Sequence, residues 1–131
     1  FVLVALTSAA TLGRVLERAD LDERSEEAYR AIAENGTGRA RVDATVRLAY
    51  RAKARKLHDE AERLWRIGVA LASAVAHREL AMLLEHTRKD KTEALRIVDD
   101  GLDLVAGRSD FASLEDDLLK RRARLSRKKP R

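Results

Sequence analysis

The residues that could do chemistry on their own are few and poorly spaced in this sequence. Three histidines, His58, His77 and His86, are scattered along the chain. Two metal ligands on one helix face need a spacing of about three or four residues, and no two of these histidines have it. We therefore interpret them as surface or packing residues. The sequence predicts no metal site and no cofactor.

Acidic clusters and a glycine-rich turn also fail to form a catalytic pattern. Asp99-Asp100 and Glu115-Asp116-Asp117 are adjacent residues, which diverge by about 100° each on a helix and so favour a solvated face. The segment 35–38 follows a predicted helix and lacks the Gly-Lys-Ser/Thr of a phosphate loop. No Ser or Thr has a readable base and orienting acid. We expect no enzyme activity here; any catalytic domain would lie outside this chain.

A repeated pattern of small and large residues predicts the helices that position the remaining polar residues. Small side chains allow two helices to approach closely, and large ones fill the flanking space. The clearest copy is Leu48-Ala49, Ala52, Ala61, Trp65 and Gly68. Related copies are Leu12-Gly13, Leu16, Ser25, Tyr29 and Ile32 before it, and Leu80-Ala81, Leu84, Ala94, Val98 and Gly101 after it.

This spacing resembles the tetratricopeptide repeat. The resemblance implies an all-α fold, an antiparallel helix-pair solenoid of about three repeats with a C-terminal capping helix. We place the repeats at residues 1–36, 37–73 and 74–107 and the capping helix from residue 109, within a domain of residues 1–119. Residues 120–131 form the basic end of the capping helix and a tail.

Capping signals divide these repeats into seven predicted helices. Capping boxes are expected at Asp20–Glu23 and Asp90–Glu93, and Gly107 is a predicted C-cap. The helices are expected over about 2–18, 21–34, 39–56, 59–73, 74–88, 91–106 and from Ser109 or Asp110 onward. The last has a narrow apolar stripe of Phe111, Leu114, Leu118 and Leu125.

The first helices of successive repeats should line a concave groove that binds a protein or peptide segment. Tyr50 and Met82 are the predicted apolar anchors, although Tyr50 could instead pack against the next repeat. The arginines of the groove could bind carboxylates or phosphates, or could be neutralised by Glu17, Asp43 and Glu85. The groove candidates are Arg14, Arg47, Tyr50, Lys53, Arg78, Met82, Glu85 and His86.

Composition adds limits on compartment and partners. Charged residues make up 37% of the chain, against roughly 25% in an average globular protein. There is no cysteine, which favours a cytoplasmic protein. Residues 1–13 carry no charge but are too short to cross a bilayer, so we expect a buried first helix and no membrane partner. An upstream domain of the same polypeptide, or a second copy in a homodimer, would cover its apolar faces.

The positive charge is concentrated at the C-terminus. The chain has a net charge of +5, but residues 1–119 hold 19 basic and 22 acidic residues. A basic run of this kind could bind nucleic acid non-specifically, or could simply be solvated. The nucleic-acid candidates are Lys120, Arg121, Arg122, Arg124, Arg127, Lys128, Lys129 and Arg131.

The third repeat carries a second resemblance. Its Leu80-Ala81 helix ends in Glu85-His86, followed by Asp90 and the Ala94-Leu95 helix. This is similar to the C-terminal helical region of bacterial RNase H-like (YprB-type) exonuclease proteins, although Thr87 interrupts the expected run before Arg88. The resemblance implies a non-catalytic accessory region of a larger nuclease, because the family's catalytic carboxylates lie in a separate upstream domain. Alternatives are nucleic-acid contact through the tail and a free-standing homodimeric adaptor.

Overall fold

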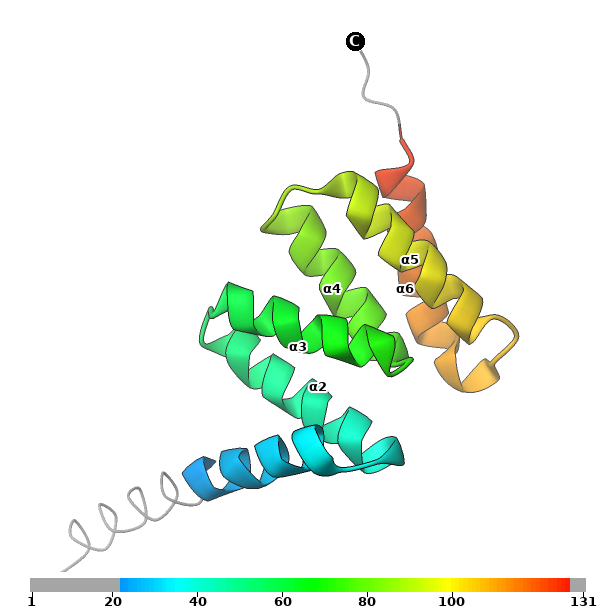
Figure 1. Cartoon of the computed structure of the whole chain (residues 1–131). Coiled ribbons are helices and arrows are strands. Elements are labelled where there is room, and N and C mark those ends of the chain that lie inside the picture. The colour runs from blue at the N-terminus through cyan, green and yellow to red at the C-terminus, as the bar shows by residue number, and fades with distance from the viewer. Residues whose placement is uncertain (1–21, 128–131) are drawn as a thin grey trace, which may run out of the picture.

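The computed structural model describes residues 22–127, and that range is helical with no strand. The all-α prediction is therefore confirmed for these residues. The predicted helix over 2–18 lies outside the described residues. The elements are a helix over 22–35, α2 (Gly38–Ala54), α3 (His58–Ala70), α4 (Ala74–His86), α5 (Lys91–Val105), the short 3-10 helix η2 (Ser109–Phe111) and α6 (Ala112–Leu125) (Figure 1).

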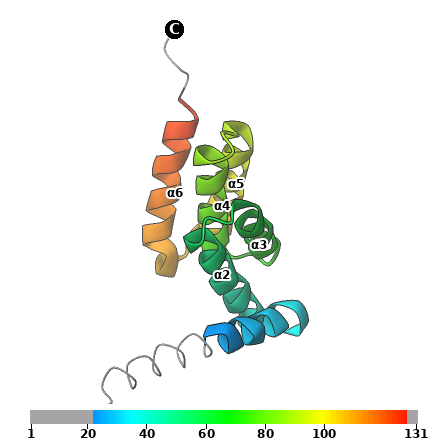
Figure 2. The same cartoon turned by 90° about the vertical axis from the view of Figure 1, so that its left-hand side faces the viewer.

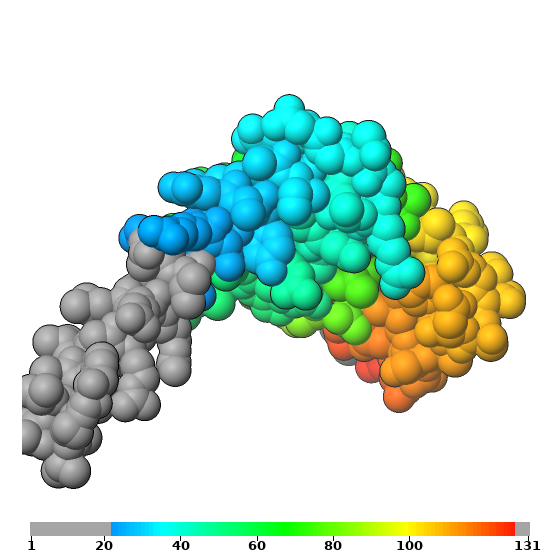
Figure 3. Space-filling model, turned by 90° about the horizontal axis from the view of Figure 1, so that it is seen from below, coloured from blue at the N-terminus to red at the C-terminus, as the bar shows by residue number. Residues whose placement is uncertain are grey.

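Each labelled helix packs against the next one along the chain. The most extensive contacts join α2 to α3 and α4 to α5, and α3 packs on α4 between these two pairs. The final helix, α6, contacts both α5 and α4, and Figure 2 shows it standing alongside them. Seen from below in Figure 3, the helix over 22–35 and α2 lie at one side, with α5 and α6 at the other.

The small-and-large pattern identifies the core. Every member of its second and third copies is buried, including the large side chains of Trp65, Leu80 and Val98. In the first copy, Tyr29 is half-buried and Ile32 is exposed, while Leu12, Gly13 and Leu16 lie outside the described residues. The core therefore extends from α2 to α6, and the two complete helix pairs supply most of it.

Two glycines of the pattern mark the closest helix approaches. A Cβ added to Gly68 on α3 would stand 2.6 Å from the Cβ of Ala76 on α4. One added to Gly101 on α5 would stand 2.9 Å from the Cβ of His77, again on α4. Real Cβ atoms do not approach this closely, because carbon atoms attract optimally at about 3.5–4.0 Å. Glycine at both positions lets α3 and α5 approach α4.

The helix ends correct one predicted boundary. The helix expected to reach Ser73 ends at Ala70, because Ser73 caps the next helix instead. Its backbone is extended, and its Oγ accepts a hydrogen bond from the Ala76 N–H at 3.1 Å. A serine that satisfies one of the unpaired N–H groups of α4 has the geometry of an N-cap, which a helical residue lacks.

Only one of the two hydrogen bonds of the predicted Asp90–Glu93 capping box is present. The Glu93 N–H donates to Asp90 Oδ1 at 3.1 Å, so Asp90 caps α5 as expected. The reciprocal bond is absent because the Asp90 N–H donates to the Leu84 carbonyl, while the Glu93 carboxylate accepts from Arg66 and Arg96. At the other end of α5, the C-cap is Ala106 rather than the predicted Gly107, which follows it with a φ of +74°.

Candidate interaction site

A small apolar pocket opens where α2, α3 and α4 meet. Its volume is about 170 Å³, below the roughly 300 Å³ at which pockets for drug-sized ligands begin. It has the size to take a single side chain rather than a nucleotide or a cofactor. This α2–α4 pocket is lined by Lys53, His58, Ala61, Trp65, Glu79, Met82, Leu83, His86 and Thr87.

Three of the predicted groove residues line this pocket directly. Lys53 comes from α2, and Met82 and His86 come from α4. Met82 is half-buried and His86 is exposed, so both residues keep part of their surface accessible to a partner. The structure therefore brings these three groove candidates together from two different helices.

The rim of the pocket is organised by a carboxylate that the sequence analysis did not select. Glu79 is only 5% exposed, and its Oε1 accepts a hydrogen bond from Lys53 Nζ at 2.6 Å. Its Oε2 lies 3.4 Å from Nη2 of Arg78. One buried acid thus holds a cation from α2 and another from its own helix beside the pocket. Each of these cations keeps part of its side chain in water.

Tyr50 combines the two roles left open for it. Its ring meets Trp65 edge to face, with ring centroids 4.9 Å apart, so it packs against α3. The residue is nevertheless 38% exposed. Its hydroxyl lies 3.4 Å from Nη2 of Arg78, and Lys53 Nζ stands 5.9 Å from the ring centroid. Tyr50 is therefore a fixed aromatic surface beside the pocket mouth.

Glu85 lies next to the pocket-lining His86 near the end of α4, and it joins α4 to α6. It is 8% exposed, and it pairs with Arg124 through two hydrogen bonds of 2.6 and 3.0 Å. Arg121 Nη1 approaches the same carboxylate at 3.3 Å, and His86 Nε2 at 3.4 Å. Burial raises the pKa of Glu85, but the hydrogen bond from Arg124 and the surrounding positive charges lower it more, so its pKa lies below the ordinary value.

The other predicted arginines are engaged within the molecule, with partners that the sequence did not indicate. The guanidinium of Arg47 lies over the Tyr29 ring at 5.4 Å from its centroid. Arg78 pairs with Glu79 rather than with Glu85. The expected partner of Arg47, Asp43, lies 4.0 Å from Arg39 instead. Arg14 and Glu17 lie outside the described residues.

Several of the basic C-terminal candidates form ion pairs within the fold, and others lie outside the described residues. Arg121 and Arg124 bind Glu85, and Arg121 is itself buried. Arg122 pairs with Asp99 at 3.1 Å, and Lys120 with Asp116 at 3.1 Å. Arg127 is exposed after the end of α6. The remaining three, Lys128, Lys129 and Arg131, lie outside the described residues.

A larger cavity of about 340 Å³ lies between the helix over 22–35, α2 and α3. Its floor is apolar, with Leu48, Leu64 and Ile67, and its rim is charged. The rim charges largely pair with one another, since Glu26 binds both Arg30 and Arg55, and Glu60 binds Arg63. We favour the smaller α2–α4 pocket as the functional candidate because the predicted anchors and exposed cations converge there.

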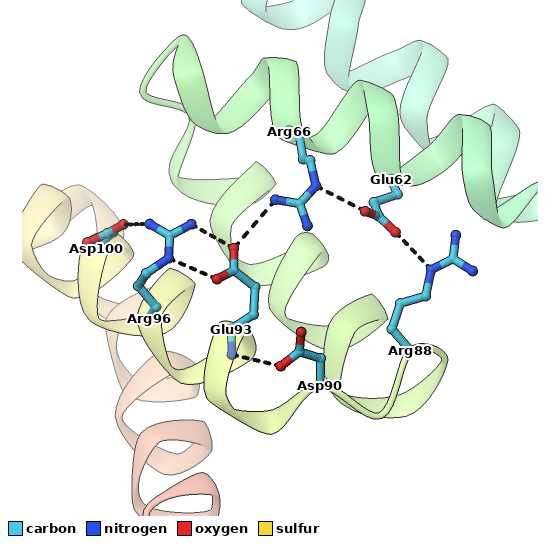
Figure 4. Close-up of polar contacts among 7 residues, drawn as sticks. All are labelled: Glu62, Arg66, Arg88, Asp90, Glu93, Arg96 and Asp100. Carbon is cyan, nitrogen blue, oxygen red and sulfur yellow. Dashed lines mark hydrogen bonds and ion pairs between the residues drawn. The ribbon is translucent and has the colours of Figure 1, made fainter.

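A chain of ion pairs runs across the face formed by α3 and α5 (Figure 4). Glu62 accepts from Arg88 at 2.8 Å and from Arg66 at 3.0 Å. Arg66 also reaches Glu93 at 3.5 Å. The chain of contacts continues from Glu93 to Arg96 at 2.6 Å and from Arg96 to Asp100 at 3.2 Å. This α3–α5 network consists of Glu62, Arg66, Arg88, Glu93, Arg96 and Asp100.

The hydrogen bonds of this network lower the pKa values of its glutamates. The bond from Arg88 lowers the pKa of Glu62, and the bond from Arg96 lowers the pKa of Glu93. Cations and anions alternate along the network, so each charge meets its opposite within the protein. This face offers an external ligand little unbalanced charge.

Within residues 22–127 there is no group of three or more His, Asp or Glu side chains placed to hold a metal ion. The same range has no helix of the length and apolar character that crossing a bilayer requires. Compared with known proteins, the chain matches no protein family, no curated protein and no solved structure.

Proposed function

We propose that this chain is a non-catalytic helical interaction module that binds a protein segment in the α2–α4 pocket. The observation that carries the proposal is the convergence of Lys53, Met82 and His86 on one small apolar pocket beside Tyr50. Exposed aromatic and thioether groups on a rigid helical surface supply contact area at low entropic cost. A single inserted side chain matches the pocket volume.

The architecture that we propose for this module is a tetratricopeptide-like solenoid of antiparallel helix pairs. It is supported by the burial of every small and large pattern position in α2 to α5. Further support comes from α6, which packs on both helices of the pair before it, as a terminal capping helix should. In such a solenoid α2 and α4 would be the first helices of successive repeats.

The resemblance to the helical region of RNase H-like exonuclease proteins leads to a second, finer proposal. The chain would then be the accessory region of a larger nuclease, with the partner segment supplied by a sister domain or another protein. Glu85 and His86, which carry that resemblance, contact each other, and Glu85 also binds the arginines of α6. The role of Glu85 in this chain is consequently to hold α4 and α6 together.

Nucleic-acid contact through the C-terminal candidates is the weaker alternative. Counterion release requires cations that are available to phosphates, and Lys120, Arg122 and Arg124 have carboxylate partners within the chain. The homodimeric adaptor depends on the predicted first helix, which lies outside the described residues. The α2–α4 pocket is the site that rests on described side chains.

Selection of a random-peptide library displayed on phage against the full 131-residue chain tests the proposal. We expect the enriched peptides to share an apolar anchor residue. Met82→Arg should fill the pocket and weaken their binding by about tenfold or more, equivalent to about 1.4 kcal/mol. The matched control is Ala123→Arg, at an exposed position of α6. Equal binding by both variants, with unchanged thermal unfolding, would place the peptide elsewhere and reject this site.

A further inference from the structure

At the mouth of the α2–α4 pocket, the cations of Lys53 and Arg78 are partly exposed to solvent, whereas the carboxylate of Glu79 is buried. The side chain of Lys53 is 47% exposed and that of Arg78 is 29% exposed, whereas Glu79 is 5% exposed. A partner at the mouth would therefore meet the two positive groups and be screened from the negative one.

The two cations keep donors for an external acceptor. An ammonium group has three N–H donors and a guanidinium has five. Among the described residues, Lys53 donates to Glu79 alone. Arg78 uses only Nη2, at 3.4 Å from both Glu79 and Tyr50. Glu79 thus fixes the positions of both groups without using up their hydrogen-bonding capacity.

This arrangement differs from the ion pairs on the α3–α5 face. There each arginine of the network lies close to two carboxylates or shares one carboxylate with another arginine. Positive and negative charges therefore balance along the chain of contacts (Figure 4). At the pocket mouth two cations share a single buried carboxylate. The pocket mouth therefore has a positive excess that the α3–α5 face lacks, and it lies within reach of whatever the apolar interior binds.

Resting on the proposed function, we propose that the α2–α4 pocket selects an acidic peptide segment with one large apolar side chain. The apolar side chain enters between Trp65, Met82 and Leu83. Carboxylates beside it on the peptide accept hydrogen bonds from Lys53 and Arg78. Hydrogen bonds that involve a charged group are roughly twice as strong as neutral ones, so the acidic residues would decide which apolar segments are bound.

Fluorescence anisotropy with defined peptides tests this selectivity on the full chain. The probe is a labelled nonapeptide with a central Leu flanked by Glu and Ser. One comparison peptide has Lys in place of each Glu, another has Ala in place of Leu, and oligo-deoxythymidine is the nucleic-acid probe. We expect the acidic Leu peptide to bind about tenfold or more tightly than the Lys peptide, since one charged hydrogen bond accounts for that factor. We expect a similar margin over the Ala peptide, because that peptide lacks most of the apolar surface that the pocket would bury.

Variants assign the selectivity to the pocket mouth. Lys53→Met removes the charge and keeps most of the stem, and it should reduce the acidic-to-basic preference about tenfold. Lys53→Arg should retain the preference. Lys91→Met, at an exposed position of α5, is the matched control and should leave it unchanged. Thermal unfolding of each variant verifies that the fold is intact.

The outcomes separate this inference from the proposed function. If phage-selected peptides bind at Met82 but show no acidic preference, charge selection is wrong and the interaction module stands. If neither selected nor defined peptides bind, both proposals fail. If oligo-deoxythymidine displaces the acidic peptide and Lys53→Met abolishes its binding, the cationic mouth recognises nucleic acid and the acidic-peptide inference is overturned.

Discussion

Glu79 and Glu85 are buried acids on one helix, and each contacts cations from a different neighbour. Glu79 connects α4 to Lys53 of α2, and Glu85 connects α4 to Arg121 and Arg124 of α6. A buried charge without a partner is strongly destabilising, so each acid and its cations depend on one another. The two carboxylates therefore have different consequences: one shapes the pocket mouth, and the other holds the C-terminal helix.

Replacing Glu85 with Gln should destabilise the fold through α6. The change keeps the shape of the side chain but leaves the buried Arg121 without its carboxylate from α4. We expect the free energy of unfolding to fall by about 2–3 kcal/mol, measured by urea denaturation. Asp116→Asn is the matched control, because Asp116 forms an exposed pair with Lys120, and such pairs contribute about 0–1 kcal/mol. Equal effects of the two changes would contradict a structural role for Glu85.

At the scale of the elements, α4 is the central helix, and its neighbours approach it at positions without a side chain. Gly68 of α3 faces Ala76, and Gly101 of α5 faces His77. Both contacts lie near the start of α4. Any increase in volume there must push α3 or α5 outward, because a Cβ anchored to a helix backbone cannot rotate away.

Gly68→Ala tests this close approach. At an exposed helix position, alanine stabilises the helix by up to about 1 kcal/mol relative to glycine. Here, however, the new Cβ would stand 2.6 Å from the Cβ of Ala76. Overpacking costs about 1–3 kcal/mol, so we expect a net loss of up to about 2 kcal/mol in urea denaturation.

Adding Ala76→Gly supplies the control for this clash. The double variant restores the missing space, so the two changes should couple favourably by about 1 kcal/mol in a double-mutant cycle. Strict additivity of the two changes would mean that α3 shifts away from α4 without cost, and that the approach at Gly68 does not limit helix separation.

For the whole molecule, the sequence predicted those features that depend on the spacing of nearby residues along the chain. The pattern through Trp65 and Gly68 identified the buried faces of α2 to α5 because a helix repeats its face every few residues. Of the groove candidates that the same phase predicted, Lys53, Met82 and His86 line one pocket, whereas Glu85 binds α6 instead. Glu79 was missed because its partner Lys53 is 26 positions away. In sequence, a buried glutamate with a distant partner resembles an exposed one.

The α3–α5 network makes the stability of the whole molecule sensitive to acid. Its hydrogen bonds hold the pKa values of Glu62 and Glu93 below the ordinary value of 4.5. A lowered folded-state pKa stabilises the protein above the unfolded pKa and loses that contribution as pH falls through the folded value. We therefore expect the free energy of unfolding to decrease below about pH 4.5, with a shallower decrease in the Glu62→Gln/Glu93→Gln variant. Urea denaturation from pH 7 downward measures both slopes, at low salt because salt screens exposed pairs. Identical slopes would mean that other carboxylates, Glu85 first among them, carry the acid sensitivity.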